Sequence, residues 1–238
     1  RAFAPRLYVT RAMKRLLGCT VVAVLVALCA SQTIYPLPSG DGPIQAKHYV
    51  QEIISTTMTC LMNYTIEVVA YNEPGYYLRS FVVPRTAFLP PEERTYQLFA
   101  NPQLFNTSFG PDSPAAMHAI ITHELNHILD YSHMDTLQLA AFGLEYAANY
   151  TFLIWYEHEN DHKVLELGFG EGLKAYREWI YGTLTPDELK AKITEYYTPW
   201  QITGWEVENN GTYNNPCENW SLFNYDCNVC HYPDDDSS

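Results

Sequence analysis

The sequence is poor in basic residues, and this scarcity excludes one class of partner. It has 14 Lys and Arg against 27 Asp and Glu in 238 residues, for a formal net charge of −13. No Lys or Arg follows Lys192. Nucleic-acid binding depends on basic patches that neutralise phosphates. We therefore expect no nucleic-acid partner.

The sequence also lacks an apolar run of the length that a membrane span requires. The run Leu16–Ala30 covers about 15 residues, whereas a transmembrane helix needs roughly 20. Met13 and two basic residues precede it, and a basic start before a short apolar run is typical of a secretory signal peptide. We predict a signal peptide over residues 1–31, in which residues 1–12 are either an extended basic region or sequence upstream of translation. The mature chain is then secreted and has no stable membrane span.

Cysteine is sparse beyond this leader. The remaining residues are Cys60, Cys217, Cys227 and Cys230. An even number suits two disulfides in an oxidising compartment, with three pairings open. Cys227-x-x-Cys230 could also be half of a zinc site, but the sequence has no second C-x-x-C to complete it. We therefore expect disulfides.

Five N-x-S/T sequons follow the leader, where composition alone would give about two. This excess favours a secreted glycoprotein. Asn149 lies in a predicted helix, which makes it the weakest acceptor. The other candidates are Asn63, Asn106, Asn210 and Asn219.

The pattern of apolar residues predicts a mainly helical α+β fold. Helical spacing predicts helices over residues 44–62, 115–133, 136–149, 151–181 (one or two helices) and 186–197. Runs rich in β-branched and aromatic residues predict strands over 65–70, 76–83 and 95–99, in a small antiparallel sheet. Residues 32–197 then form one domain. Residues 198–238, rich in Cys, aromatic and acidic residues, form a loop-rich, disulfide-stapled tail.

The 115–133 helix contains His123-Glu124-x-x-His127, the motif H-E-x-x-H. Residues i and i+4 of a helix lie about one turn apart on the same face, so the two imidazoles can bind one Zn²⁺. Glu124 then stands beside the metal's open position, where it can take a proton from the attacking water. The neighbouring residues are uncharged, as a helix packed in a cleft requires. The motif predicts a zinc-dependent peptidase with a peptide or protein substrate.

A catalytic zinc needs a third protein ligand, and two candidates follow the motif closely. His133 extends it to H-E-x-x-H-x-x-D-x-x-H, which resembles the metzincin pattern. Metzincins have Gly where Asp130 stands and a Met-turn downstream, whereas no Met follows Met134. Glu145 follows His127 at a spacing similar to that of several thermolysin-like families.

The third candidate is Glu157, which forms an E-x-x-x-D unit with Asp161. On a helix these carboxylates share a face, so Glu can bind zinc while Asp holds the other ring N–H of a ligand His. The unit resembles the glutamate-ligand zincins, or gluzincins. The longer pattern also resembles a group of little-characterised, secreted zinc peptidases, mostly bacterial, over roughly residues 95–197. It comprises D-Y-S at 130–132, Y-E-x-x-x-D at 156–161 and G-x-G-x-x-L-x-x-Y-R-x-W at 168–179.

This resemblance implies a zincin-like fold and a role for each residue of the motif. His123, His127 and Glu157 bind Zn²⁺, and their tips should then converge to within about 4 Å of one another. Glu124 is the general base. Asp161 orients a ligand His, which we expect to be His123. An endopeptidase is favoured over an exopeptidase.

The sequence leaves two alternatives unresolved. The residue that stabilises the oxyanion is one, and its candidates are Tyr176, Arg177 and His162. The other is whether the protein is an enzyme. The alternative is a secreted glycoprotein that retains zinc but acts by binding, with the acidic, aromatic tail as its interaction module.

Overall fold

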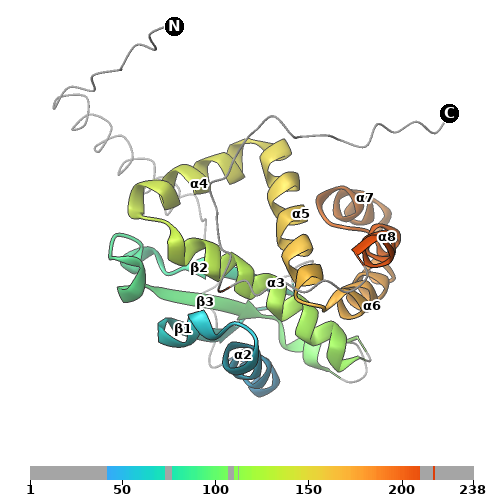
Figure 1. Cartoon of the computed structure of the whole chain (residues 1–238), viewed down its shortest axis with the longest axis horizontal. Helices are drawn as coiled ribbons and strands as arrows, with labels where there is room; N and C mark the ends of the chain where they lie inside the picture. Colours follow the sequence, from blue (N-terminus) through green and yellow to red (C-terminus); the bar gives the residue numbers. More distant parts are fainter. Residues whose placement is uncertain (1–41, 73–76, 107–109, 112, 210–216, 218–238) are drawn as a thin grey trace, which may run out of the picture.

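A long central helix, α3 (Pro114–His133), organises the fold in the computed structural model (Figure 1). The structure describes residues 42–72, 77–106, 110–111, 113–209 and 217. Before α3 come α2 (Ile44–Thr56), η1 (Thr59–Asn63), β1 (Thr65–Ala70), β2 (Leu78–Val82), η2 (Pro84–Thr86), η3 (Pro91–Glu93), β3 (Thr95–Ala100) and η4 (Pro102–Phe105). After it come α4 (Thr136–Ala148), α5 (Tyr150–Glu166), α6 (Gly170–Tyr181), α7 (Pro186–Glu195) and α8 (Pro199–Asn209).

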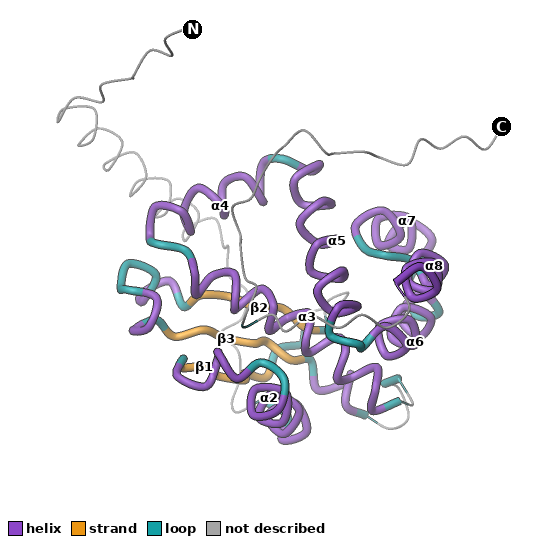
Figure 2. Tube along the Cα trace, in the orientation of Figure 1, coloured by secondary structure: helices purple, strands orange, loops and turns teal. Residues whose placement is uncertain are grey.

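The ends of α3 follow from its sequence. Ser113 is the N-cap, and its hydroxyl accepts the backbone N–H of Ala116. Pro114 occupies the first turn, where its missing N–H costs nothing. Most of the residues from Ala116 to Ser132 are buried, because α2 and the sheet lie on one side of the helix and α5 and α6 on another (Figures 1 and 2). The predicted helix over 115–133 is confirmed.

The sheet has three strands in the order β1-β3-β2. β3 pairs parallel with β1 and antiparallel with β2, so the prediction of an antiparallel sheet is wrong for one of its two pairs. The central strand has the clearest alternation, with Tyr96, Leu98 and Ala100 fully buried. This pattern fixes which face of β3 meets the core. It does not determine which neighbour pairs with β3 or in which direction.

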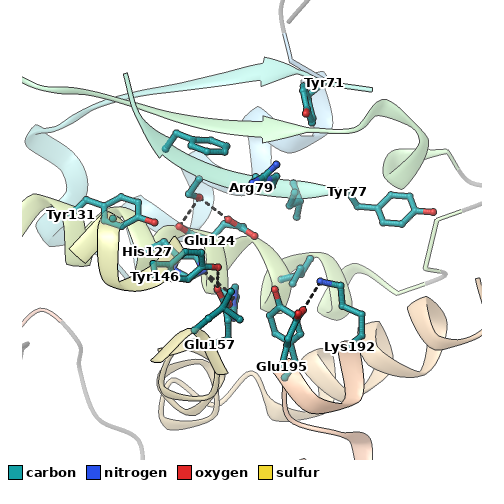
Figure 3. Close-up of a pocket in the computed structure, with 18 of the residues that line it drawn as sticks. Tyr71, Tyr77, Arg79, Glu124, His127, Tyr131, Tyr146, Glu157, Lys192 and Glu195 are labelled. Carbon is teal, nitrogen blue, oxygen red and sulfur yellow. Dashed lines mark hydrogen bonds and ion pairs between the residues drawn. The ribbon is translucent and has the colours of Figure 1, made fainter. Parts of the chain in front are cut away.

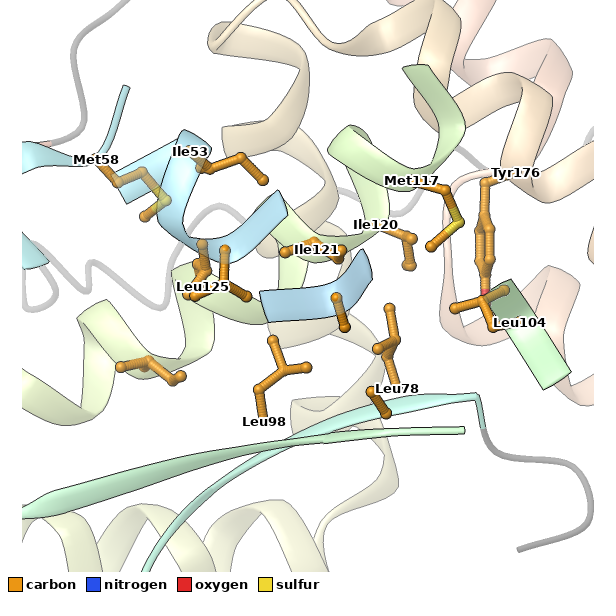
Figure 4. Close-up of a cluster of buried hydrophobic side chains, with 14 of the residues drawn as sticks. Ile53, Met58, Leu78, Leu98, Leu104, Met117, Ile120, Ile121, Leu125 and Tyr176 are labelled. Carbon is orange, nitrogen blue, oxygen red and sulfur yellow. The ribbon is translucent and has the colours of Figure 1, made fainter. Parts of the chain in front are cut away.

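The hydrophobic core lies between α3 and the inner face of the sheet (Figure 4). Ile121 and Leu125 of α3 face Leu98 of β3 and Ile53 of α2, and all four side chains are fully buried. Burial of each such side chain contributes about 1.5–3 kcal/mol. The helix that carries the H-E-x-x-H motif is therefore held rigidly against the sheet.

The helical half contains one element that the sequence interpretation missed. The 151–181 segment forms two helices, and Gly168 between them has φ 83°, a conformation that suits glycine at a helix C-terminus. Residues Pro199–Asn209 form helix α8, so the prediction of a loop-rich tail from residue 198 is wrong for this stretch. Ile202 of α8 is fully buried against α3, α5 and α6, so α8 belongs to the body of the domain.

One disulfide links the described residue nearest the C-terminus to the segment that follows α2. Cys60 in η1 is bonded to Cys217. This bond identifies the partner of Cys60 among the three pairings that the sequence allowed. Cys227, Cys230, the signal peptide, and the sequons at Asn210 and Asn219 lie outside the described residues. Within the part that the structure describes, no helix is both long and apolar enough to span a membrane.

Candidate metal centre

Two helices bring three potential ligand atoms together. α3 presents His123 and His127 on one face, and their Nε2 atoms lie 3.2 Å apart. α5 presents Glu157, whose Oε2 lies 3.1 Å from His123 Nε2 and 3.5 Å from His127 Nε2. All three side chains are buried. Ligands at about 2.0–2.1 Å from one tetrahedral centre lie about 3.3–3.4 Å apart, so this spacing fits a shared metal ion.

Glu124 lies beside the same cluster. Ligand atoms of His123, Glu124 and His127 lie within 4.8 Å of one another, and this buried group could hold a metal ion. Glu157 Oε2 lies less than 4.8 Å from the Nε2 atoms of both His123 and His127. The two carboxylates therefore both lie next to the histidine pair, one from the motif itself and one from α5.

The two other candidate ligands have different surroundings. His133 is exposed at the end of α3, and its Nδ1 lies 2.8 Å from the carbonyl oxygen of Leu129. Glu145 is exposed on α4 and accepts a hydrogen bond from Asn149. The structure thus brings Glu157 to the histidine pair, and neither His133 nor Glu145 belongs to that buried group.

Asp161 lies one turn after Glu157 and approaches the far side of the first imidazole. Its Oδ1 is 2.9 Å from His123 Nδ1. The carboxylate also accepts two hydrogen bonds from Arg177 Nη2, at 2.8 and 3.0 Å, and one from the backbone N–H of Tyr197. Asp161 is fully buried, so these partners are what offset its loss of water. With its proton on Nδ1, His123 has the lone pair of Nε2 directed at the cluster.

The second imidazole has a partner that the sequence interpretation did not identify. His127 Nδ1 lies 3.1 Å from the hydroxyl of Tyr156. Tyr156 donates its own proton to Asp130 at 2.7 Å, and Asp130 forms an ion pair with Lys163 at 3.0 Å. Nδ1 also lies 3.2 Å from the amide Nδ2 of Asn160. A hydroxyl oxygen can accept a proton whereas an amide NH2 group cannot. The Nδ1–H tautomer of His127, which leaves Nε2 free to bind a cation, is therefore the one that uses Tyr156 as its partner. Asp130 and Tyr156 belong to the D-Y-S and Y-E-x-x-x-D motifs, but their contact joins two helices and cannot be predicted from spacing along the sequence.

The remaining oxygen of the Glu157 carboxylate is also held. Tyr146 of α4 donates a short hydrogen bond to Glu157 Oε1. Only Oε2 therefore faces the two histidines, which favours binding through a single oxygen.

The charges of the cluster shift the pKa values of its members. Burial alone would lower the pKa of His123, but the carboxylates of Asp161 and Glu157 outweigh it and raise the pKa to about 9. Burial would raise the pKa of Glu157, yet the two histidines hold it well below its usual range. The negative charge of the site thus favours a second proton on His123, on Nε2. A divalent cation can replace this Nε2 proton.

Glu124 faces a cleft that runs along strand β2 (Figure 3). The cleft has a volume of about 690 Å³, and helices α3 to α7 supply its other walls. The hydroxyl of Ser80 in β2 lies 2.8 Å from the side-chain Oε2 of Glu124 and 2.9 Å from its backbone oxygen, so its single proton is shared between these two acceptors. Ser80 is buried, and it fixes the carboxylate of Glu124 at the edge of the cleft next to the two histidines.

The candidates for oxyanion stabilisation are dispersed. Tyr176 and Arg177 line the cleft, but the guanidinium of Arg177 is engaged by Asp161. The ring of His162 packs against Trp205 of α8, with centroids 5.6 Å apart. Tyr196, which the sequence interpretation missed, also lines the cleft, and its ring centroid lies 5.9 Å from that of His123.

Cations contact the ring of Tyr196. The guanidinium carbon of Arg177 lies 4.4 Å from its centroid and Lys192 Nζ lies 4.7 Å from it. Burial, followed by the charge of Glu157, raises the pKa of Tyr196 well above its usual value. Its hydroxyl therefore keeps its proton.

Comparison with known proteins adds no relative to this description. No protein-family model matches the chain, and no curated protein or solved structure matches it either.

Proposed function

We propose that this protein is a secreted zinc metallopeptidase of the gluzincin type, which hydrolyses peptide bonds with Glu124 as general base. The observation that carries the proposal is the convergence of His123 Nε2, His127 Nε2 and Glu157 Oε2 within 3.5 Å of one another. The Cys60–Cys217 disulfide agrees with an oxidising, extracellular compartment.

The donor set supports zinc as the metal. Two imidazole nitrogens and one carboxylate oxygen are a set that catalytic zinc sites use, with a fourth position left open. Both imidazoles have a partner on their other ring nitrogen, Asp161 for His123 and Tyr156 for His127. When bound here, Zn²⁺ would polarise the scissile carbonyl and lower the pKa of the attacking water.

The residues of the chain then divide the work. Glu124, held by Ser80, takes a proton from the attacking water and delivers it to the leaving amine. Tyr196, which lines the cleft near His123, would donate its hydroxyl proton to the oxygen on which negative charge develops. Asp161 and Tyr156 orient the imidazoles and do not contact the substrate.

The experiment that tests this proposal compares the wild type with Glu124→Gln. The amide has nearly the same shape as the carboxylate but accepts no proton, so peptide hydrolysis should fall by about 10²–10⁴-fold, the range of general-base catalysis. Zinc content, measured by elemental analysis, should stay the same. Equal activities of the two proteins, with zinc bound in both, would contradict the enzymatic proposal and favour a protein that acts by binding.

A further inference from the structure

Helix α4 has an apolar face that does not pack into the core. Among its residues, only Ala140 is buried. Amphipathic helices normally bury their apolar stripe against the rest of the domain. In α4, a stripe at spacings i, i+3, i+4, i+7 and i+8 lines the cleft instead. Its members, called the α4 stripe below, are Leu139, Phe142, Gly143, Tyr146 and Ala147.

Gly143 makes room in the middle of this stripe. Apart from its own helix backbone and its chain neighbours, no described atom lies within 4 Å of the position that a Cβ would take there. Glycine in the interior of a helix is destabilising relative to alanine, and its backbone here does not need a positive φ. Packing therefore gives no reason for glycine at this position. The space in front of it belongs to the cleft and can admit a side chain from outside the protein.

The α4 stripe is directly continuous with the candidate metal centre. Tyr146, one turn after Gly143, donates its hydroxyl to Glu157. Phe142 packs against Tyr131 and Tyr156, with centroids 5.7 and 4.7 Å away. Leu153 of α5 lines the cleft as well. Gly143 therefore lines the same cleft as these aromatic and aliphatic groups, and the stripe reaches the cluster through Tyr146.

We propose that the α4 stripe is a subsite for a large apolar side chain of the substrate, of the size of Leu or Phe. The inference rests on the proposed peptidase function and names the substrate class that the cleft selects. A side chain that enters beside Gly143 is removed from water against Leu139, Phe142 and Leu153. Its peptide backbone remains next to Glu124 and the histidine pair. Gly143 then sets the size limit of the subsite.

The test measures binding, so that it does not depend on turnover. The full-length Glu124→Gln protein is loaded with zinc and titrated into short fluorescein-labelled Gly-Ser peptides that carry a single Ala, Leu or Phe. Fluorescence anisotropy gives the three dissociation constants. We expect the Leu and Phe peptides to bind about tenfold or more tightly than the Ala peptide, since each methylene in an apolar pocket is worth roughly 10-fold or more. Adding Gly143→Leu should abolish most of this preference.

The chain offers a matched control in Gly204. This glycine is also in a helix, α8, and the position of a Cβ there is likewise open to 4 Å outside its own helix backbone and chain neighbours. It does not line the cleft. Gly204→Leu should keep the full Leu-over-Ala preference. Ala147→Leu, at an exposed residue of the same stripe, provides a second way to fill the subsite if Gly143→Leu does not fold. Circular dichroism establishes folding for each variant.

Three results would overturn the subsite. The first is equal affinity for the Ala, Leu and Phe peptides. The second is a preference that survives both Gly143→Leu and Ala147→Leu. The third is self-association that Gly143→Leu abolishes in the absence of peptide, because it would assign the stripe to a second copy of the chain. Failure of the peptidase proposal has a different signature: the Leu preference is present, but the wild type hydrolyses none of these peptides.

Discussion

Replacement of Arg177 by Met distinguishes a structural role from a catalytic one. Arg177 was a candidate for oxyanion stabilisation, but its Nη2 contacts both oxygens of Asp161, which in turn contacts His123. Both partners of this ion pair are buried. Arg177→Met removes the guanidinium from the buried carboxylate of Asp161 and leaves it only His123 and the backbone N–H of Tyr197 as partners. Removal of one partner of a buried ion pair costs about 3–5 kcal/mol in stability.

The same change should weaken zinc binding. Loss of a group that supports a ligand's partner typically costs about 10–100-fold in metal affinity. We expect both effects in Arg177→Met, with zinc affinity measured by competition with a chelator and stability by urea denaturation. Arg85→Met, at an exposed arginine of η2, is the matched control and should change stability by at most about 0.5 kcal/mol.

A double variant tests whether Arg177 and Asp161 act as a pair. Asp161→Asn removes the unpaired charge, so Arg177→Met combined with Asp161→Asn should cost clearly less than the sum of the two single changes. Additive losses would show that the two side chains do not act as a pair. A fall in kcat with unchanged zinc affinity and stability would instead return Arg177 to the reaction itself.

Three further predictions follow from the site. Ser80→Ala removes a hydrogen bond to the charged Glu124, worth about 1.5–3 kcal/mol. We therefore expect kcat/KM to fall about 10–100-fold while the zinc content, measured by elemental analysis, stays constant. Loss of zinc in this variant would refute a role of Ser80 through Glu124. Glu157→Gln should lose zinc on dialysis, whereas Glu145→Gln should retain it. The reverse outcome would make Glu145, and not Glu157, the third zinc ligand. Removal of the metal with EDTA should lower the thermal midpoint, because a ligand present at 100 times its Kd stabilises the native state by about 2.7 kcal/mol; an unchanged midpoint in calorimetry would contradict metal binding to the native state.

Local signals in the sequence are sufficient to predict where most helices lie and which residues of α3 belong to the candidate metal centre. Ser113 and Thr185 are the N-caps of α3 and α7, and each is followed by a proline in the first turn. Such starts can be read from the sequence, because capping involves only residues within one turn. The same signal was available for α8. Thr198 and Gln201 form the equivalent contacts, and the T-P-x-Q spacing before residues 199–209 could have predicted that helix. Unusual composition in the tail obscured it.

Contacts between elements could not be predicted in this way. The parallel pairing of β1 with β3 depends on how the chain connects the strands. The alternation of buried and exposed residues along a strand is compatible with either neighbour and either direction, so it does not predict the pairing. Tyr156 and Asp130 meet only because α5 lies across α3. Ser80 reaches Glu124 from a strand that lies far from it in the sequence. Spacing along α3 defines two ligands and a base, and the E-x-x-x-D unit points to Glu157 and Asp161. The contacts of Ser80, Tyr156 and Asp130 come from tertiary packing.

The disulfide between Cys60 and Cys217 has a consequence for the integrity of the whole site. The bond spans a sequence separation of 157 residues, and both histidines, both glutamates and every helix from α3 to α8 lie within the covalent ring that it closes. Closing a ring of this size lowers the entropy of the unfolded chain by an amount worth about 5 kcal/mol in a chain-entropy estimate. A single backbone cut in an exposed loop of the ring would open it without releasing any piece. A nicked molecule would therefore keep all its segments linked and could retain its cluster until a reductant separates the two fragments.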